Sequence, residues 1–154
     1  MKVVTAIPPP AAEPQKANEV TLPFGLIGFP EHKHMELLYL PEQLPFLWIR
    51  LHGPTPLHFI VIEPGNVLSD YEPELFDEDA TAIGLTDPAD AMVLNIVCLQ
   101  PDRPHAATVN LVGPVIINRR TGVGKQVVLA NHGRFSAHHP LLGETATASG
   151  PAQA

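Results

Sequence analysis

This 154-residue sequence has few cysteines and few long apolar runs. Over one third of the chain it also lacks basic residues. Cys98 is the only cysteine, which excludes an intramolecular disulfide and is consistent with a reducing compartment. No segment approaches the ~20 apolar residues that a transmembrane helix needs, and the opening MKVVTAIPPP is too short in apolar residues for a signal peptide. We therefore expect a cytoplasmic protein that does not enter a membrane.

No lysine or arginine lies between Arg50 and Arg103, although ten of the sixteen carboxylates do. Such a stretch repels phosphate backbones and attracts cationic surfaces, which predicts a basic protein partner rather than direct nucleic-acid binding. A run of charge is also typical of a solvated face that only keeps a protein soluble, and this interpretation stays open here. The ten acids are Glu63, Asp70, Glu72, Glu74, Asp77, Glu78, Asp79, Asp87, Asp90 and Asp102.

The two ends of the chain differ in composition from its middle. Apolar residues make up 45% and charged residues 16% of the whole, which is a globular balance, and the length favours one domain. Residues 6–14 are mostly proline and alanine, and residues 143–154 are small and polar. Neither end carries enough apolar surface to offset the entropy of ordering it. We expect disordered tails at residues 1–18 and 143–154 and a single domain at residues 19–142.

Prolines and glycines divide the middle of the chain into short segments rich in β-branched and aromatic residues. A spacing of roughly 8–12 residues between such segments is typical of an antiparallel sandwich or barrel. Several segments are apolar on nearly every residue, which favours strands covered on both faces. The sequence predicts an all-β, mainly antiparallel fold: a small closed or partly open β-barrel with one short helix. The predicted strands are residues 36–40, 46–51, 58–63, 92–99, 108–112, 115–118 and 126–129.

The one helix is predicted after the segment Asp77-Glu78-Asp79. Asp77 is a suitable N-cap, the next two acids suit the positive end of the helix dipole, and Gly84 can end the helix. A second short helical turn is predicted from Thr86 or Asp87, with Pro88 in its first turn.

The apolar centres of the strands predict the core. Cys98 lies in such a strand, so we expect a buried thiol that behaves as a small hydrophobe and is unreactive. Asn95 and Asn110 interrupt apolar strands, where a buried amide needs hydrogen-bond partners, and a structural role is favoured over a catalytic one. The residues predicted to be buried are Trp48, Phe59, Ile60, Ile62, Leu94, Ile96, Cys98, Val109, Ile116 and Val127.

Motifs for catalysis or metal binding are not found. The eight histidines have no cysteine or carboxylate at ligand spacing, so we expect no metal and no cofactor. Residues 121–126 resemble a phosphate loop, but Arg119 stands where its first glycine would fall, and Gln126 replaces its Ser or Thr. No GxSxG is present. We expect no enzyme. A small enzyme or metal-binding β protein using the histidines, and a general peptide-binding β module, remain as alternatives.

Four short segments are specific when taken in order: DYEPEL at residues 70–75, followed by the acidic helix start, and then ATVNL at 107–111, PVIIN at 114–118 and GKQVVL at 124–129. With these segments, the sequence from about Thr21 to Leu142 resembles the FliW family of flagellar assembly factors. Two departures stand out. A proline-rich stretch replaces the charged strand with which the family usually opens, and Phe24 stands at a position where the family usually has an acid.

The resemblance implies a non-catalytic regulatory protein with two protein partners. One is CsrA, a small basic translational repressor whose hold on flagellin messenger RNA such proteins block from outside the RNA groove; the other is flagellin, which competes for them. For the repressor we expect a binding surface made of Asp70, Tyr71, Glu72, Glu74, Asp77, Glu78 and Asp79. For flagellin we expect apolar contacts at Val115, Ile117 and Val127.

Overall fold

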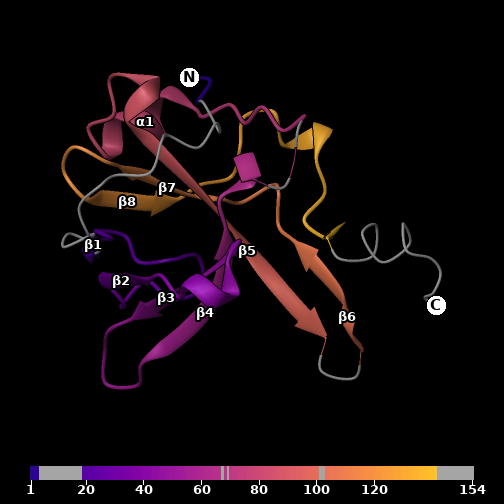
Figure 1. Ribbon diagram of the computed structural model, residues 1–154. Coiled ribbons are helices and arrows are strands. Elements are labelled where there is room, and N and C mark those ends of the chain that lie inside the picture. Colours follow the sequence, from indigo (N-terminus) through magenta and orange to yellow (C-terminus); the bar gives the residue numbers. More distant parts are fainter. Residues whose placement is uncertain (4–18, 67, 69, 101–102, 142–154) are drawn as a thin grey trace.

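The computed structural model describes residues 1–3, 19–66, 68, 70–100 and 103–141, and its nine strands form one continuous sheet (Figure 1). Four 3-10 turns and one α-helix join them: η1 (Pro41–Gln43), η2 (Pro64–Asn66), α1 (Asp77–Ala82), η3 (Pro88–Asp90) and η4 (His132–Arg134). The strands are β1 (Glu19–Thr21), β2 (His34–Leu38), β3 (Phe46–Leu51), β4 (Leu57–Ile62), β5 (Ala91–Gln100), β6 (Arg103–Val109), β7 (Val115–Asn118), β8 (Val123–Gln126) and β9 (His139–Pro140).

Seven of the strands close into a barrel. Their order is β4-β3-β2-β1-β8-β7-β5, and a further pairing of β4 with β5 completes the ring. All pairs are antiparallel except β1 with β8, which meet in parallel at Thr21 and Val123. The predicted all-β, mainly antiparallel barrel with one short helix is therefore confirmed, and the barrel is closed.

The long strand β5 belongs to two parts of the molecule. Its first half pairs with β7, and its middle pairs with β4 on one edge and with β6 on the other. The outer edge of β6 then carries β9. In Figure 1 the ends of β5 and β6 project from the barrel as a separate arm.

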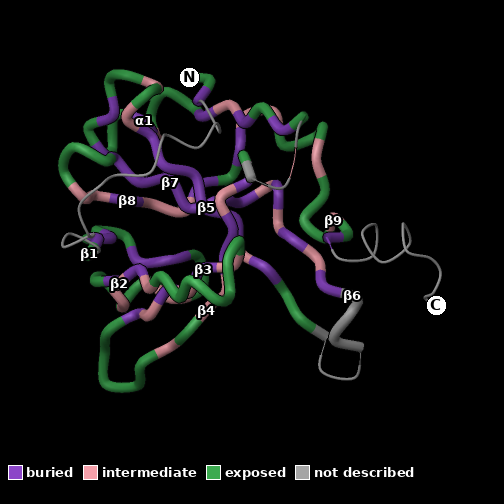
Figure 2. The backbone as a smooth tube through the Cα atoms, viewed as in Figure 1, coloured by how far each residue is buried: buried purple, intermediate pink, exposed green. Residues whose placement is uncertain are grey.

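The central strands are buried on both faces, as their uniform apolarity predicts. Met92 and Leu94 of β5 join the cluster inside the barrel, whereas Val93 between them joins a second cluster outside it. The same alternation divides Ile116 of β7 from its neighbours. Leu75 and Ala80 of α1 belong to the outer cluster, so the helix and the loop before it cover this side of the barrel. Figure 2 shows the resulting continuous burial along β7 and the first half of β5.

The predicted core is right in part. Five of its residues are buried: Ile62, Leu94, Val109, Ile116 and Val127. Four are only half-buried: Trp48, Phe59, Ile60 and Ile96. The prediction for Cys98 is wrong, because its side chain is exposed.

The reasons for these differences lie in β3 and β5. In β3 the barrel interior receives Leu47, Ile49 and Leu51, and the opposite face, with Trp48, points outward. The Trp48 indole donates to Gln43 Oε1 at 2.7 Å, which satisfies its N–H at the surface. In β5 the pairing with β4 ends at Val97, so Cys98 has already left the barrel.

Strand boundaries agree fully at β3 and β7 and differ elsewhere. β8 begins three residues before the predicted segment at 126–129 and includes Gly124, which sequence rules assign to a turn. A Cβ at Gly124 would lie 3.1 Å from the Ile116 carbonyl oxygen, so glycine lets these backbones approach closely. The turn itself ends at Gly122, whose φ is +77°. β6 also begins earlier than predicted, and β1 and β9 were not predicted.

The helix lies where predicted, but its N-cap does not. Phe76 occupies the cap position without a side-chain hydrogen bond, and Asp77 is the first helical residue. Gly84 follows the helix with a φ of +67°, as expected of a stop. The second turn is confirmed as η3: Asp87 caps it, and its Oδ1 accepts a hydrogen bond from the Ala89 N–H at 3.0 Å.

The first three residues contradict the predicted N-terminal tail. Val3 is buried in the outer cluster, and its N–H donates to the Pro73 carbonyl at 3.3 Å. The Met1 carbonyl accepts from the Leu75 N–H at 2.7 Å. The rest of the expected tail, residues 4–18, and the expected tail at 143–154 lie outside the described residues. No helix in the described ranges is both long enough and apolar enough to cross a membrane.

Candidate protein-binding surface

The acidic segment at residues 70–76 is held in an extended path by its neighbours. Glu74 forms an isolated β-bridge with Lys2 on one side, and its carbonyl accepts from the Ala130 N–H at 2.8 Å on the other. Asn131 fixes the same stretch twice: its Nδ2 donates to the Glu72 carbonyl at 2.9 Å, and its Oδ1 accepts from the Glu74 N–H at 3.0 Å. The backbone that carries these acids is therefore bound on both sides.

Alternation along this extended segment separates buried anchors from exposed acids. Tyr71, Pro73 and Leu75 are buried, while Asp70 and Glu72 are exposed and Glu74 is half-buried. An extended backbone sends successive side chains to opposite faces, which explains the pattern. The DYEPEL sequence thus places acids on the surface by burying the residues between them.

Tyr71 is one of these anchors and not, as predicted, a contact residue. Its side chain is 5% exposed, its hydroxyl donates to the Leu111 carbonyl at 2.7 Å, and it accepts from Asn95 Nδ2 at 3.1 Å. Burial raises the pKa of Tyr71 to about 12, against the opposing effect of the Asn95 hydrogen bond. The hydroxyl therefore stays neutral and joins the acidic segment to the barrel.

The two asparagines within the apolar strands serve this junction, as the structural interpretation predicts. Asn95 Nδ2 also donates to the Asn110 carbonyl at 2.9 Å. Asn110 Oδ1 accepts from the Val112 and Gly113 N–H groups, both at 2.9 Å, and so forms the turn before β7.

The three acids of α1 are not equivalent. The Asp77 side chain is 99% exposed, and Glu78 is also exposed. Asp79 is mostly buried, and its Oδ1 accepts from Lys125 Nζ of β8 at 2.5 Å. Its charge is therefore compensated within the chain, and Asp79 ties the helix to the barrel.

The fold brings cations from both ends of the sequence to the stretch that has none of its own. Besides Lys125, the Met1 amino group lies 3.8 Å from Asp77, and Lys2 lies beside Glu74. Elsewhere in that stretch, Arg119 and Arg120 lie 3.9 Å from Glu63 and Asp90, respectively. Within the described chain, Asp70, Glu72 and Glu78 have no ion pair, and the surface over residues 70–79 keeps a net negative charge.

Glu63 and Arg119 form a partly buried pair beside Tyr39. Burial raises the pKa of Glu63, and the guanidinium of Arg119 opposes that rise. Burial, with the nearby Glu63 carboxylate, also raises the pKa of Tyr39. Burial near a single ion pair accounts for both pKa shifts, so the shifts are not evidence that this cluster is a functional site.

The residues predicted to contact flagellin do not lie on the surface. Val115 and Ile117 lie inside the barrel, and Val127 is buried in the outer cluster. Because β7 is covered on both faces, none of its apolar residues can meet a partner. The exposed apolar side chains beside the acidic segment are instead Phe24, Ile27, Phe76 and Val128. Sequence reasoning noted Phe24 only as a departure from the family pattern, and nothing in local periodicity marked the others as exposed.

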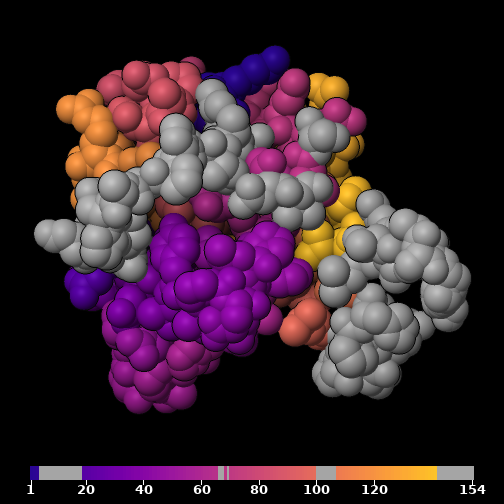
Figure 3. Space-filling view, viewed as in Figure 1, coloured from indigo at the N-terminus to yellow at the C-terminus, as the bar shows by residue number. Residues whose placement is uncertain are grey.

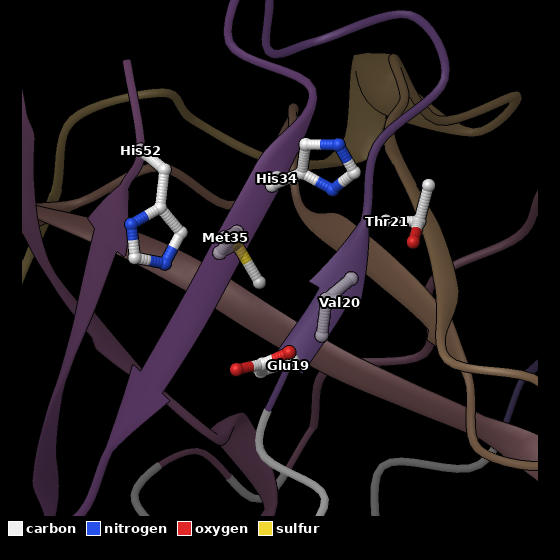
Figure 4. A pocket seen from close by; sticks show the side chains of 6 residues that line it. All are labelled: Glu19, Val20, Thr21, His34, Met35 and His52. Atoms are coloured by element: carbon white, nitrogen blue, oxygen red, sulfur yellow. The ribbon is translucent and has the colours of Figure 1, made fainter. Parts of the chain in front are cut away.

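The histidines do not assemble a metal site in the described residues, where no group of three or more His, Cys, Asp or Glu side chains could hold an ion. His34 and His52 border a pocket on β1 and β2 together with Glu19, Val20, Thr21 and Met35 (Figure 4). His52 Nε2 lies 3.8 Å from Glu36, which also pairs with Arg50. Glu19, Thr21, His34 and His52 are exposed around this pocket, whereas Val20 and Met35 belong to the cluster inside the barrel.

Comparison with known proteins agrees with the fold. The family model described as FliW protein matches residues 10–141. The flagellar assembly factor FliW of Natranaerobius thermophilus is 37% identical over 128 residues, which cover 83% of this chain and 84% of that protein. The one from Leptospira biflexa is 38% identical over 106 residues and 69% of each chain. A crystal structure of the flagellar assembly factor FliW superposes with a TM-score of 0.70 at 32% identity, covering 83% of this chain and 88% of that one. This chain therefore belongs to the FliW family of flagellar assembly factors.

Proposed function

We propose that this chain works in flagellum assembly by binding a basic, CsrA-like translational repressor and releasing flagellin messenger RNA from it. Flagellin is proposed as the competing partner, and the cytoplasm, where translation is repressed, as the place of action. Family membership supports the flagellar role. The observation that carries the choice of a basic partner is the set of exposed acids on the fixed backbone of residues 70–78.

Charge and rigidity together suit this role. Exposed carboxylates steer a cationic partner toward the surface and set the orientation in which it docks. Because the backbone of the acidic segment is already fixed by Asn131 and by the buried anchors, docking costs little ordering entropy there. Once bound, an acidic surface near the RNA groove of the repressor raises the free energy of RNA entering that groove. Part of the antagonism then needs no direct occupation of the groove.

The test is a double charge reversal outside α1, Asp70→Lys with Glu72→Lys. Both side chains are exposed and lie before the helix, so the helix dipole is not disturbed. We expect repressor affinity to fall at least tenfold, about 1.4 kcal/mol, and wild-type affinity to fall with added salt. Isothermal titration across a salt series measures both effects.

The control is Glu19→Lys with Glu42→Lys, which changes the net charge equally at two exposed positions outside residues 70–79. Its repressor affinity should stay close to that of the wild type. Equal losses of repressor affinity in both double variants would mean that only the net charge of the protein matters, and not the position of the acids. Unchanged binding in the Asp70/Glu72 variant, with no salt dependence, would mean that the acids only keep the protein soluble.

Flagellin should displace the repressor from the wild-type protein, and failure to do so would remove flagellin from the proposal.

A further inference from the structure

Four exposed apolar side chains lie near α1 and the end of β8: Phe24, Ile27, Phe76 and Val128, here called the apolar patch. They come from three parts of the sequence. Phe24 and Ile27 belong to the loop after β1, Phe76 precedes α1, and Val128 follows β8. Between 46% and 59% of each residue is exposed, although each is large and apolar.

Two contacts connect the loop after β1 to β8. Lys125 Nζ lies 5.0 Å from the centroid of the Phe24 ring, and the Ile27 N–H donates to Gln126 Oε1 at 3.0 Å. Val128 lies two residues beyond Gln126, and the buried residues on either side of it, Val127 and Leu129, show that its side chain points outward. These three apolar residues therefore lie around the end of β8.

A second set of contacts brings Phe76 to the same place. Asp79, the partner of Lys125, donates its N–H to the Phe76 carbonyl at 3.1 Å, one turn away. The Ala130 N–H donates to the Glu74 carbonyl, which links the segment leading to Phe76 with the segment that carries Val128. In Figure 3 the residues of α1 lie beside the orange residues of the hairpin that β7 and β8 form.

The apolar patch is bordered by negative charge. Lys125 is neutralised by Asp79, whereas Asp77 and Glu78 on the neighbouring helix are exposed. Lys33 Nζ donates to the Pro23 and Pro30 carbonyls, both at 3.1 Å, in the loop that carries Phe24 and Ile27. An apolar centre with a charged rim is the usual arrangement of a protein interface, and exposed aromatic residues commonly carry much of the binding free energy. An acidic rim selects a partner that presents an apolar side chain flanked by lysine or arginine.

We propose that the apolar patch is the affinity-determining half of the repressor-binding surface, and that it receives an apolar side chain flanked by cations on the basic repressor. This inference rests on the proposed function and divides the surface in two. The exposed acids of residues 70–78 govern the approach of the partner and its salt dependence, whereas the apolar patch slows its dissociation.

The experiment compares Phe24→Ala with Ile27→Ala, as a double variant, against Leu40→Ala with Leu44→Ala. The control residues Leu40 and Leu44 are 37% and 55% exposed, and they lie immediately before and after η1. Surface plasmon resonance with the repressor should show at least a tenfold faster dissociation for the Phe24/Ile27 variant and less than a twofold change for the control. The slope of affinity against salt should stay that of the wild type, and thermal melting verifies the fold of each variant. Phe76→Ala provides a second test from a different part of the sequence.

Each outcome decides between the proposals. This inference would be overturned if both patch variants released the repressor at the wild-type rate while the Asp70→Lys, Glu72→Lys variant bound it more weakly. The proposed function would then still stand. No repressor binding by the wild-type chain would overturn the proposed function and this inference with it. Analytical ultracentrifugation tests whether a second copy of this chain occupies the apolar patch instead. If the wild-type protein is a dimer, the Phe24→Ala, Ile27→Ala variant is a monomer and repressor binding is intact, the apolar patch serves self-association.

Discussion

The two ends of β5 have similar sequences and different surroundings. Met92, Val93 and Leu94 are buried between the barrel interior and the outer cluster, whereas Cys98 and Leu99 are exposed four residues further on (Figure 2). Pairing explains the change, because β4 ends its contact with β5 at Val97 and only β6 continues beyond it. An apolar run therefore predicts a strand, but the register of the neighbouring strands decides where that strand stops being core.

The largest expected effect compares truncations at the two ends. Leu94→Ala should lower the free energy of unfolding by about 2–5 kcal/mol, because Leu94 is fully buried inside the barrel and a cavity would remain. Leu99→Ala should change it by no more than about 0.5 kcal/mol, since the Leu99 side chain is already 47% exposed. Urea denaturation followed by the fluorescence of Trp48 measures both values. Similar losses at the two positions would show that the arm carries a core of its own.

The same comparison shows how far the sequence leads. In β3 the sequence predicted Trp48 as a core residue, but the side chains that enter the barrel are Leu47, Ile49 and Leu51 on the opposite face. The uniform apolarity of β7 correctly predicted burial on both faces, and the same burial removes Val115 and Ile117 from any binding surface. The alternation of residues along a strand shows which side chains share a face. Which of the two faces lies inside depends on how the barrel closes, and closure is set by pairing between strands that are far apart in the sequence.

The acidic segment shows the corresponding limit for the candidate site. Its position and its net charge could be predicted from the absence of lysine and arginine between Arg50 and Arg103. The neutralisation of Asp79 by Lys125 could not, because 46 residues separate them in the sequence. The apolar patch was missed for the same reason, since it is assembled from three separate segments.

An intermediate effect is expected at Tyr71, whose hydroxyl accepts a hydrogen bond from Asn95 in the buried part of β5. Tyr71→Phe removes the hydroxyl that donates to the Leu111 carbonyl and accepts from Asn95, which leaves buried polar groups without their partner. We expect a loss of about 1–3 kcal/mol in the free energy of unfolding. Repressor affinity should fall less than in the charge reversal, because the acids themselves remain. Tyr39→Phe, at a tyrosine that is 39% exposed, is the matched control and should be nearly neutral. Equal stability of wild type and Tyr71→Phe in urea would mean that the hydroxyl does not hold the acidic segment to the barrel.

The smallest effect on stability is expected at Cys98, where the sequence predicted a buried, unreactive thiol and the structure exposes it. A maleimide or disulfide reagent should label the folded protein at a rate close to that of the denatured chain, because no packing blocks approach to the sulfur. Cys98→Ser should abolish labelling and change the free energy of unfolding by no more than about 0.5 kcal/mol. A thiol that reacts only in denaturant would place Cys98 in a packed environment and extend the core into the arm. A thiol that reacts freely in the native protein sets the end of the core at Val97, where β4 leaves β5 and the two environments of this strand divide.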